Sequence, residues 1–317
     1  MSAEKYFITN RGGGLGDDMC NIQAVHFLAK KYGGSVILDW RILPYNNKAT
    51  CKVNLIHSLF KIPNEIEGVK FYTFEEIPEL SEVNDAFSRP QITNNISIAD
   101  IDKLVSEYNF INVCLRTGGC ESNSYKEFKC ENYILENYLS FWSNFELQNS
   151  IKTKLDYYRS KYFSAGNVIG IHIRHGNGET PAPKPPNWYS HNSVKQKINE
   201  ILKIEYPNGI DNKQFFICAD NKNCTYDFLK SYPTAFSTEK TFSEDGEGAL
   251  HMTCRNPIST IQEAFVDMEL LSNCELGILT ICSVFNLWAG LKLKRSYYYD
   301  GDRYFKSKHL YSGNDGV

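Results

Sequence analysis

Short apolar runs alternate with longer segments of helical period along this chain. Residues 5–9 (KYFIT) predict a short buried strand, and the glycine-rich stretch 11–16 (RGGGLG) predicts a sharp turn after it. Apolar positions then recur at helical spacing through residues 19–34, which end in two glycines, and residues 35–40 (SVILDW) predict the next buried strand. The order strand, turn, helix and strand makes one βαβ unit.

The same alternation returns in the second half of the chain. Residues 168–174 (VIGIHIR), 214–220 (QFFICAD) and 275–280 (ELGILT) predict three further strands. Helical period marks the segments between them, most clearly residues 193–206 and 259–274. The second half therefore repeats the strand–helix order of the first.

Two successive α/β halves predict an α/β fold with two Rossmann-like parallel-sheet domains that face each other across a cleft. Residues 131–163 are mostly helical in pattern and are expected to bridge the halves. The expected domains are therefore 1–160, which includes the bridging helices, and 161–317. Residues 50–130 are harder to assign, although the stretches KFYTFEEI and INVCL predict strands there.

Charge and composition narrow the function classes. The chain has 34 Lys and Arg against 37 Asp and Glu, and 34 − 37 gives a net charge of −3 without any long basic block, which argues against nucleic-acid binding. The N-terminus lacks the layout of a secretory signal, and no window reaches the about 18 uninterrupted apolar residues of a transmembrane helix. A cytoplasmic protein is therefore expected, with peripheral membrane contact left open. None of the 10 cysteines forms a CxxC pair, so a zinc cluster lacks support.

The strand predicted at 168–174 ends in a short segment rich in polar side chains. Four of them follow one another between glycines: Arg174, His175, Asn177 and Glu179. Ligands of open parallel sheets bind beyond the carboxyl ends of the strands, which is where this segment lies. Arg174 offers a planar fork of donors that suits a phosphate or a carboxylate. The alternative is an Arg–Asp structural pair beside a glycine turn, but the density of polar groups favours a functional site.

Further polar positions are expected at the same sheet edge. Asp220 and Thr280 end two of the predicted strands, and Ser283 opens a helix whose N–H groups suit a phosphate. Asp267 lies in the apolar setting AFVDMELL, where a carboxylate needs a partner. A guanine base with two adjacent N–H donors would serve, and so would a buried Arg or a helix cap. The residues alone do not decide between these partners.

The glycine turn near the N-terminus fits neither common phosphate-binding loop. It lacks the GxxxxGK[ST] spacing of a Walker loop and the third glycine of GxGxxG. Asp17 and Asp18 follow it; either could cap the helix, and their charge disfavours phosphate. Gly14, Gly16 and Asp17 therefore suit a sugar hydroxyl in the cleft, or packing alone. The sequence has no HExxH and no DxD at the end of a strand, so no metal ion is expected.

Four stretches of the chain occur in a familiar order. They read RGGGLGDDMCNIQAVHFLAKKYGGSVILDWR, VIGIHIRHGNGE, FFICADN and AFVDMELLSNCELGILTICSVF. Together they resemble the motifs of the nodulation-type α-1,6-fucosyltransferases, which are related to the eukaryotic N-glycan core α-1,6-fucosyltransferases. The four motifs occur in family order across nearly the whole chain, and residues 45–160 between them are not matched.

The resemblance implies a two-domain glycosyltransferase of GT-B type that uses a GDP-sugar, inverts the anomeric centre and needs no metal ion or other cofactor. Arg174 would bind the β-phosphate and stabilise the leaving GDP. The main chain near His172 and the carboxylate of Asp267 would recognise guanine. Ser283, together with Thr280, would contact phosphate.

The same resemblance assigns the remaining polar residues. Asp220 would support the cleft, and Asn177 would belong to the nucleotide-sugar site. Core-type enzymes carry a second Arg at the position of His175 and a Lys at that of Gly178, whereas nodulation-type enzymes share the HGNG found here. Inverting transfer needs a base for the acceptor hydroxyl, and Glu179 is the first candidate, followed by His175.

The leading hypothesis is a GDP-fucose-dependent fucosyltransferase that acts on a glycan or oligosaccharide acceptor. Two alternatives keep the fold: another GDP- or UDP-sugar donor, or a non-catalytic protein that binds a nucleotide sugar or a glycan. A Rossmann-type oxidoreductase is disfavoured because the GxGxxG pattern fails. These motifs do not specify the acceptor, the linkage or the oligomeric state.

Overall fold

The computed structural model divides the chain into two units, Met1–Gln148 and Asn149–Val317. This division comes before the boundary expected at residue 160, because helix α5 (Asn149–Tyr158) packs on helix α9 (Pro257–Leu271) within the second unit. No helix in the described part of the chain is long and apolar enough to cross a membrane. The described residues are 4–9, 13–41, 53–80, 89–93, 96–115, 130–163, 166–174, 190–232, 234–242, 256–281, 283–299 and 304–306.

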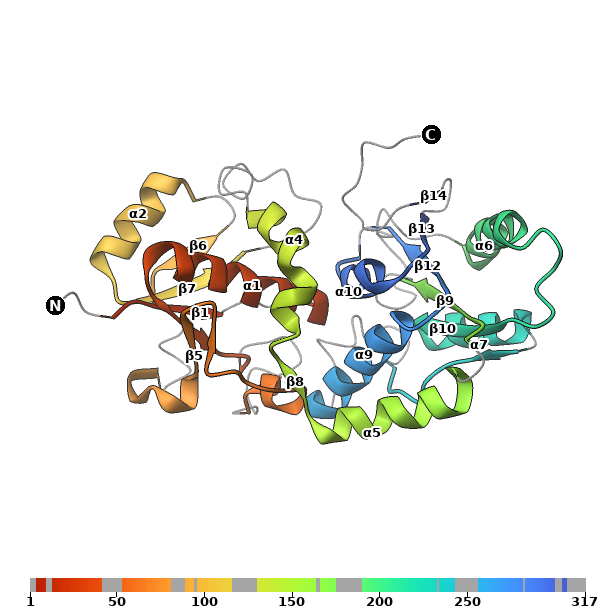
Figure 1. The fold of residues 1–317 in the computed structure, drawn as a ribbon, viewed down its shortest axis with the longest axis horizontal. Helices are drawn as coiled ribbons and strands as arrows, with labels where there is room; N and C mark the ends of the chain where they lie inside the picture. Colours follow the sequence, from red (N-terminus) through yellow and green to blue (C-terminus); the bar gives the residue numbers. More distant parts are fainter. Residues whose placement is uncertain are drawn as a thin grey trace. The chain divides into compact units, whose positions relative to one another are not determined.

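The described residues of the first unit contain a six-stranded, mostly parallel sheet (Figure 1). Its strands are β1 (Tyr6–Thr9), β2 (Ser35–Leu38), β4 (Glu65–Ile66), β5 (Val69–Thr73), β6 (Gln91–Thr93) and β7 (Phe110–Cys114). They lie in the order β4-β5-β2-β1-β7-β6, and β4 alone among these runs antiparallel to its neighbour. The first strand of the chain is therefore an interior strand, paired in parallel with β2 and β7.

Helix α1 (Leu15–Tyr32) follows β1, as the glycine turn and the helical period predicted. Its N-cap is Gly14, whose carbonyl accepts a hydrogen bond from Asp18 N at 3.1 Å. The expectation that Asp17 or Asp18 caps the helix is therefore wrong; both lie in its first turn, where their charge suits the helix dipole. Gly33 ends the helix with a φ of 71°, a left-handed conformation that favours glycine.

The stretch KFYTFEEI is a strand only in its first half. β5 ends at Thr73, and the 3-10 turn η2 (Phe74–Glu76) follows directly. Glu76 Oε2 accepts a hydrogen bond from Thr73 N at 2.6 Å, so the backbone turns away from the sheet here. The other elements of this unit are η1 (Leu55–Ser58), β3 (Phe60–Lys61), η3 (Pro78–Leu80), α2 (Ile98–Glu107), α4 (Cys130–Trp142) and β8 (Glu146–Leu147).

The second unit also contains a six-stranded sheet among its described residues. Its strands are β9 (Val168–Ile173), β10 (Gln214–Ala219), β11 (Ala235–Phe236), β12 (Leu276–Thr280), β13 (Ser296–Tyr299) and β14 (Tyr304–Lys306). They lie in the order β11-β10-β9-β12-β13-β14, parallel except for the pair β13 and β14. The three strands predicted for this half are confirmed as β9, β10 and β12, with β9 between the other two.

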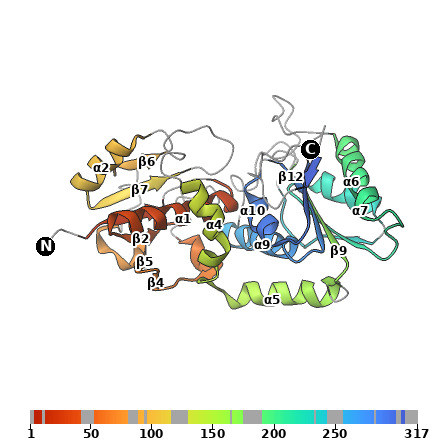
Figure 2. The ribbon, with the colours of Figure 1, turned by 45° about the horizontal axis from the view of Figure 1, so that its top comes forward.

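Side-chain caps open two helices on one side of this sheet. Ser190 Oγ accepts from Ser193 N at 3.2 Å before α6 (His191–Glu205), and Asn221 Oδ1 accepts from Cys224 N at 2.9 Å before α7 (Lys222–Ser231). Both helices flank the sheet in Figure 2. The described helical elements are completed by the π-helical turn η5 (Arg159–Phe163) and α10 (Phe285–Lys292).

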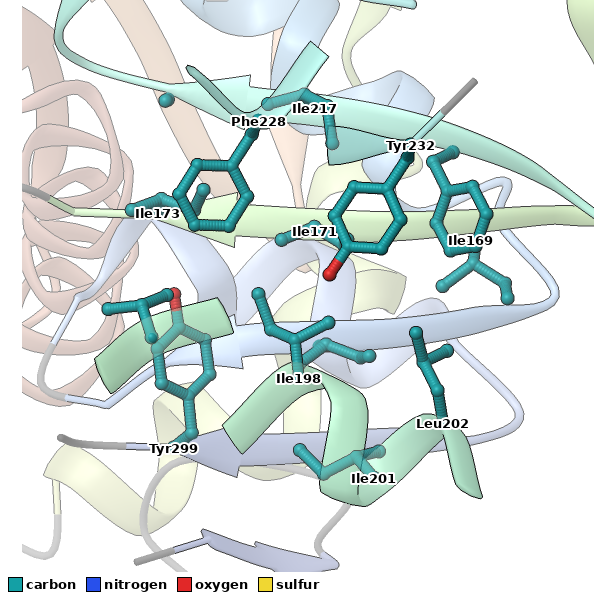
Figure 3. Close-up of a cluster of buried hydrophobic side chains, with 14 of the residues drawn as sticks. Ile169, Ile171, Ile173, Ile198, Ile201, Leu202, Ile217, Phe228, Tyr232 and Tyr299 are labelled. Atoms are coloured by element: carbon teal, nitrogen blue, oxygen red, sulfur yellow. The ribbon is translucent and has the colours of Figure 1, made fainter. Parts of the chain in front are cut away.

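The core of the second unit lies between the sheet and helices α6 and α7 (Figure 3). Ile169, Ile171 and Ile173 alternate along β9 and belong to this core. Ile198 of α6 and Phe228 of α7 pack in the same cluster and are fully buried. Since strand side chains alternate between the faces, the residues between these isoleucines point to the opposite face.

That opposite face of β9 is packed closely by α9. A Cβ atom built at Gly170 would lie 2.6 Å from Leu271 Cδ1 and 2.8 Å from Cys274 Sγ. Glycine therefore allows the helix to approach the strand at this point. His172 is the next residue on the same face, toward the carboxyl end of the strand.

Helix α6 offers a matched test of this packing. Replacing the fully buried Ile198 by Ala should lower the free energy of unfolding by about 2–5 kcal/mol, because it leaves a cavity in the core. Replacing Ile204 by Ala should change the free energy of unfolding by less than about 0.5 kcal/mol, because Ile204 lies on the same helix with 56% of its surface exposed. Denaturant unfolding of both variants measures the difference, and equal effects would contradict the packing described here.

Candidate functional site

The carboxyl ends of three adjacent strands in the second unit bring polar side chains together. Arg174 follows β9, Asp220 follows β10, and Thr280 is the last residue of β12. Arg174 N donates to Thr280 Oγ1 at 3.0 Å, and Arg174 Nη1 donates to Asp220 Oδ2 at 2.6 Å. The structure thus gathers at one edge three residues that the sequence placed on separate strands.

Arg174 and Asp220 form a partly exposed ion pair. Their side chains are 32% and 20% exposed, so part of the guanidinium side chain is accessible from solvent. The structural alternative drawn from the sequence, an Arg–Asp pair, is therefore present. It does not exclude a ligand, because an arginine has five N–H donors and can serve a carboxylate and a phosphate together.

The main-chain carbonyl of His172 is held by two hydroxyl groups. Thr280 Oγ1 donates to it at 2.9 Å, and Tyr299 OH donates to it at 3.0 Å. Asn286 Nδ2 donates in turn to the carbonyl of Thr280 at 2.6 Å. Burial raises the pKa of Tyr299, which therefore stays a neutral donor. Thr280 links strand ends within the protein, while its expected phosphate contact stays a prediction.

The His172 ring lies on the α9 and α10 side of the sheet. It is only 5% exposed and stacks on Phe285 of α10, with ring centroids 5.2 Å apart and planes 17° apart. Its Nδ1 atom has no hydrogen-bond partner among the described residues. Burial, opposed by the charge of Asp220, lowers the pKa of His172 to about 3. The imidazole is therefore neutral near pH 7.

Asp267 has partners from the segment that follows β11. Its Oδ2 accepts from Lys240 Nζ at 2.5 Å, its Oδ1 accepts from Thr238 Oγ1, and Cys218 Sγ lies 3.6 Å from Oδ2. The lysine and aspartate side chains are only 8% and 4% exposed. Among the described residues, a lysine and a threonine are bound to this carboxylate, and neither the Arg nor the helix cap considered from the sequence is.

The titration of these groups follows from their burial. Burial lowers the pKa of Lys240, but Asp267, together with Cys218 and Asp220, more than offsets this and leaves the pKa above its usual value. Burial, reinforced by Asp267, raises the pKa of the Cys218 thiol well above its usual range. Lys240 is therefore charged and Cys218 is protonated near neutral pH.

The remaining predicted residues divide between two places and the undescribed part of the chain. Ser283 is nearly buried just before α10, and its carbonyl accepts from Asn286 N at 3.0 Å. Gly14, Gly16 and Asp17 lie at the start of α1 in the first unit. The three other predicted residues, His175, Asn177 and Glu179, lie outside the described residues.

Sequence reasoning missed Lys240, Thr238, Phe285 and Tyr299. The first two lie in a stretch that reads as polar loop, where no periodic pattern marks a buried position. The signal was the unexplained carboxylate of Asp267, which required a donor but did not specify which one. Among the described residues, no group of three or more His, Cys, Asp and Glu side chains could hold a metal ion.

Comparison with known proteins shows which family this chain resembles. Residues 3–307 match the family described as Nodulation protein Z (NodZ). A Nodulation protein Z from Azorhizobium caulinodans is 27% identical over 302 residues, which cover 92% of this chain and 90% of that protein.

Two solved structures of NodZ α-1,6-fucosyltransferase share the fold. The one co-crystallized with GDP is 20% identical, has a TM-score of 0.64 and covers 98% of this chain and 100% of its own. The one soaked with GDP-fucose is also 20% identical, with a TM-score of 0.64 and coverage of 96% and 99%. The expected class, an α/β fold of GT-B type with two Rossmann-like sheet domains, is confirmed. Because the family match extends over nearly the whole length, this chain belongs to the Nodulation protein Z (NodZ) family.

Proposed function

We propose that this chain is a GDP-fucose-dependent fucosyltransferase that acts on a glycan or oligosaccharide acceptor, with inversion and without a metal ion. Family membership supports the proposal, as do relatives of the same fold whose structures were obtained with GDP and with GDP-fucose. The observation that carries it is Arg174, held by Asp220 and Thr280 beyond the carboxyl end of β9. This is where an open parallel sheet binds its ligand.

Arg174 suits the departure of GDP. When the bond from the fucose anomeric carbon to the β-phosphate oxygen breaks, its electron pair stays on that oxygen. A guanidinium that is already oriented stabilises this charge without reorganising. Asp220 fixes the side chain of Arg174 by accepting from its Nη1 atom, and Thr280 fixes the main chain of Arg174 by accepting from its amide N–H. In this proposal the cation does the work that a metal ion does in other transferases.

The acceptor hydroxyl forms the new bond to the anomeric carbon from the face opposite the leaving group. Its proton must pass to a base, for which Glu179 is proposed first and His175 second. Asn177 and Ser283 contribute to binding of the nucleotide sugar, and Asp267 recognises guanine. Gly14, Gly16 and Asp17 are proposed to contact the acceptor sugar.

A charge-removing variant tests the central residue. Arg174→Ala should lower kcat by at least about a hundredfold, because the leaving GDP loses its oriented cation. Arg159→Ala is the matched control: Arg159 is 36% exposed, pairs with Glu269 at 2.9 Å in the same unit and lies outside the proposed site. Its kcat should stay near that of the unmodified chain. Normal turnover by a folded Arg174→Ala variant would refute the assignment.

Thermal unfolding with a panel of nucleotides tests the donor. GDP and GDP-fucose should raise the unfolding midpoint, since a ligand present at about a hundredfold its Kd adds about 2.7 kcal/mol to stability. GDP-mannose, UDP and NAD complete the panel, and every measurement is repeated with EDTA. A rise with UDP instead would point to another donor. If no nucleotide raised the midpoint, the chain would have lost donor binding. A GDP effect that EDTA abolishes would contradict metal independence.

The base is tested by paired substitutions. Glu179→Gln should lower kcat by about 10²- to 10⁴-fold and remove the acidic limb of the pH–rate profile. The reason is that no base then takes the proton of the sugar hydroxyl. His175→Gln should have the smaller effect. A larger loss in the histidine variant would exchange the two assignments.

A further inference from the structure

Lys240 is a buried cation whose position is set by its neighbours in the chain. Glu239 N donates to Tyr158 OH of α5 at 2.9 Å, and Thr241 N donates to Glu263 Oε2 of α9 at 2.9 Å. The backbone on both sides of Lys240 is therefore fixed against two helices. The side chain is directed from this fixed segment onto Asp267, as the 2.5 Å contact between Nζ and Oδ2 requires.

This arrangement leaves Asp267 closed to a ligand. Lys240 donates to one carboxylate oxygen and Thr238 donates to the other. With only 4% of its side chain exposed, Asp267 can meet a base only when a donor is displaced. A buried ion pair adds little net stability over apolar residues of the same volume, so stability alone does not account for a lysine here.

We infer that Lys240 is an internal competitor of the nucleotide, which occupies the Asp267 carboxylate until a guanine base replaces it. The inference rests on the proposed function and adds a displacement step at the same site. Guanine presents two adjacent donors, N1–H and the N2 amino group, which match the two oxygens of a carboxylate. Uracil presents one N–H between two carbonyl acceptors, and adenine presents an amino group beside an acceptor. Neither can replace both donors on the carboxylate, so a uracil or adenine base is expected to leave Lys240 on Asp267.

Two substitutions of Lys240 should change GDP affinity in opposite directions. Lys240→Met keeps the length of the side chain and removes its charge, so GDP no longer competes with it and should bind at least about tenfold more tightly. Lys240→Arg keeps the charge and offers a bidentate fork that is harder to displace, so GDP should bind at least about tenfold more weakly. Affinity for UDP should change less in both variants. Titration calorimetry measures each Kd, and the unfolding midpoint without ligand is recorded alongside.

Lys292→Met is the matched control. Lys292 pairs with Glu269 of the same helix α9 at 2.7 Å, so its loss also breaks an ion pair to that helix, away from Asp267. GDP affinity should not change in this variant. If Lys240→Met lowers the unfolding midpoint while GDP affinity is unchanged or weaker, and Lys240→Arg behaves as the unmodified chain, the pair is structural and the inference is overturned.

The remaining outcomes are also decisive. If Lys240→Met does not fold, Lys240→Arg decides the matter, since it preserves charge and volume. If the unmodified chain binds GDP and neither variant shifts its affinity, the inference fails and the proposed function stands. If the unmodified chain does not bind GDP at all, the proposed function and this inference both fall.

Discussion

Burial of β9 on both faces is the constraint on which the second unit depends. All six of its residues are buried, with α6 and α7 covering one face and α9 the other. A strand covered in this way has room for polar chemistry only where it leaves the sheet. The hydroxyl groups of Thr280 and Tyr299 both bind the carbonyl of His172 at that exit. They tie the ends of three strands together and so set the direction in which Arg174 emerges.

Each unit buries a carboxylate with a cation, and the two pairs differ in form. In the first unit, Asp39 follows β2 and accepts from Arg41 at 2.9 Å and 2.8 Å, in a bidentate pair that stacks on Phe74. In the second, Asp267 holds the single point charge of Lys240. A planar bidentate pair is rigid, whereas an ammonium on a flexible stem is easier to exchange. Geometry therefore separates a pair that fixes structure from one suited to exchange.

The sequence predicted the parts of the fold where one physical signal dominates. The strands β9, β10 and β12 were recognised because long apolar runs end abruptly in polar residues, and parallel pairing then implied that Arg174, Asp220 and Thr280 share an edge. Two other predictions, the N-cap of α1 and the length of β5, were wrong because local hydrogen bonds favoured a different backbone conformation. Gly14 caps α1 although two aspartates follow, and β5 turns at Thr73 because Glu76 reaches back to its N–H.

Contacts between distant segments were beyond the sequence. The partner of Asp267 comes from a polar stretch that carries no periodic mark, so the need for a donor was visible while its source was not. The division of the chain before α5 depends on how that helix packs on α9, where Lys154 Nζ and Gln262 Oε1 meet at 3.3 Å. Helical period identifies a helix, but it does not say which sheet the helix accompanies.

Gly170 has a further consequence. Leu271, which a methyl group at this position would strike, lies one helical turn after Asp267 on α9. The smallest side chain of β9 therefore acts as a spacer that determines how low α9 settles on the sheet, and with it the depth at which the carboxylate of Asp267 is set. The absence of a side chain at Gly170 of β9 thus determines where the carboxylate of Asp267, on helix α9, lies relative to the sheet.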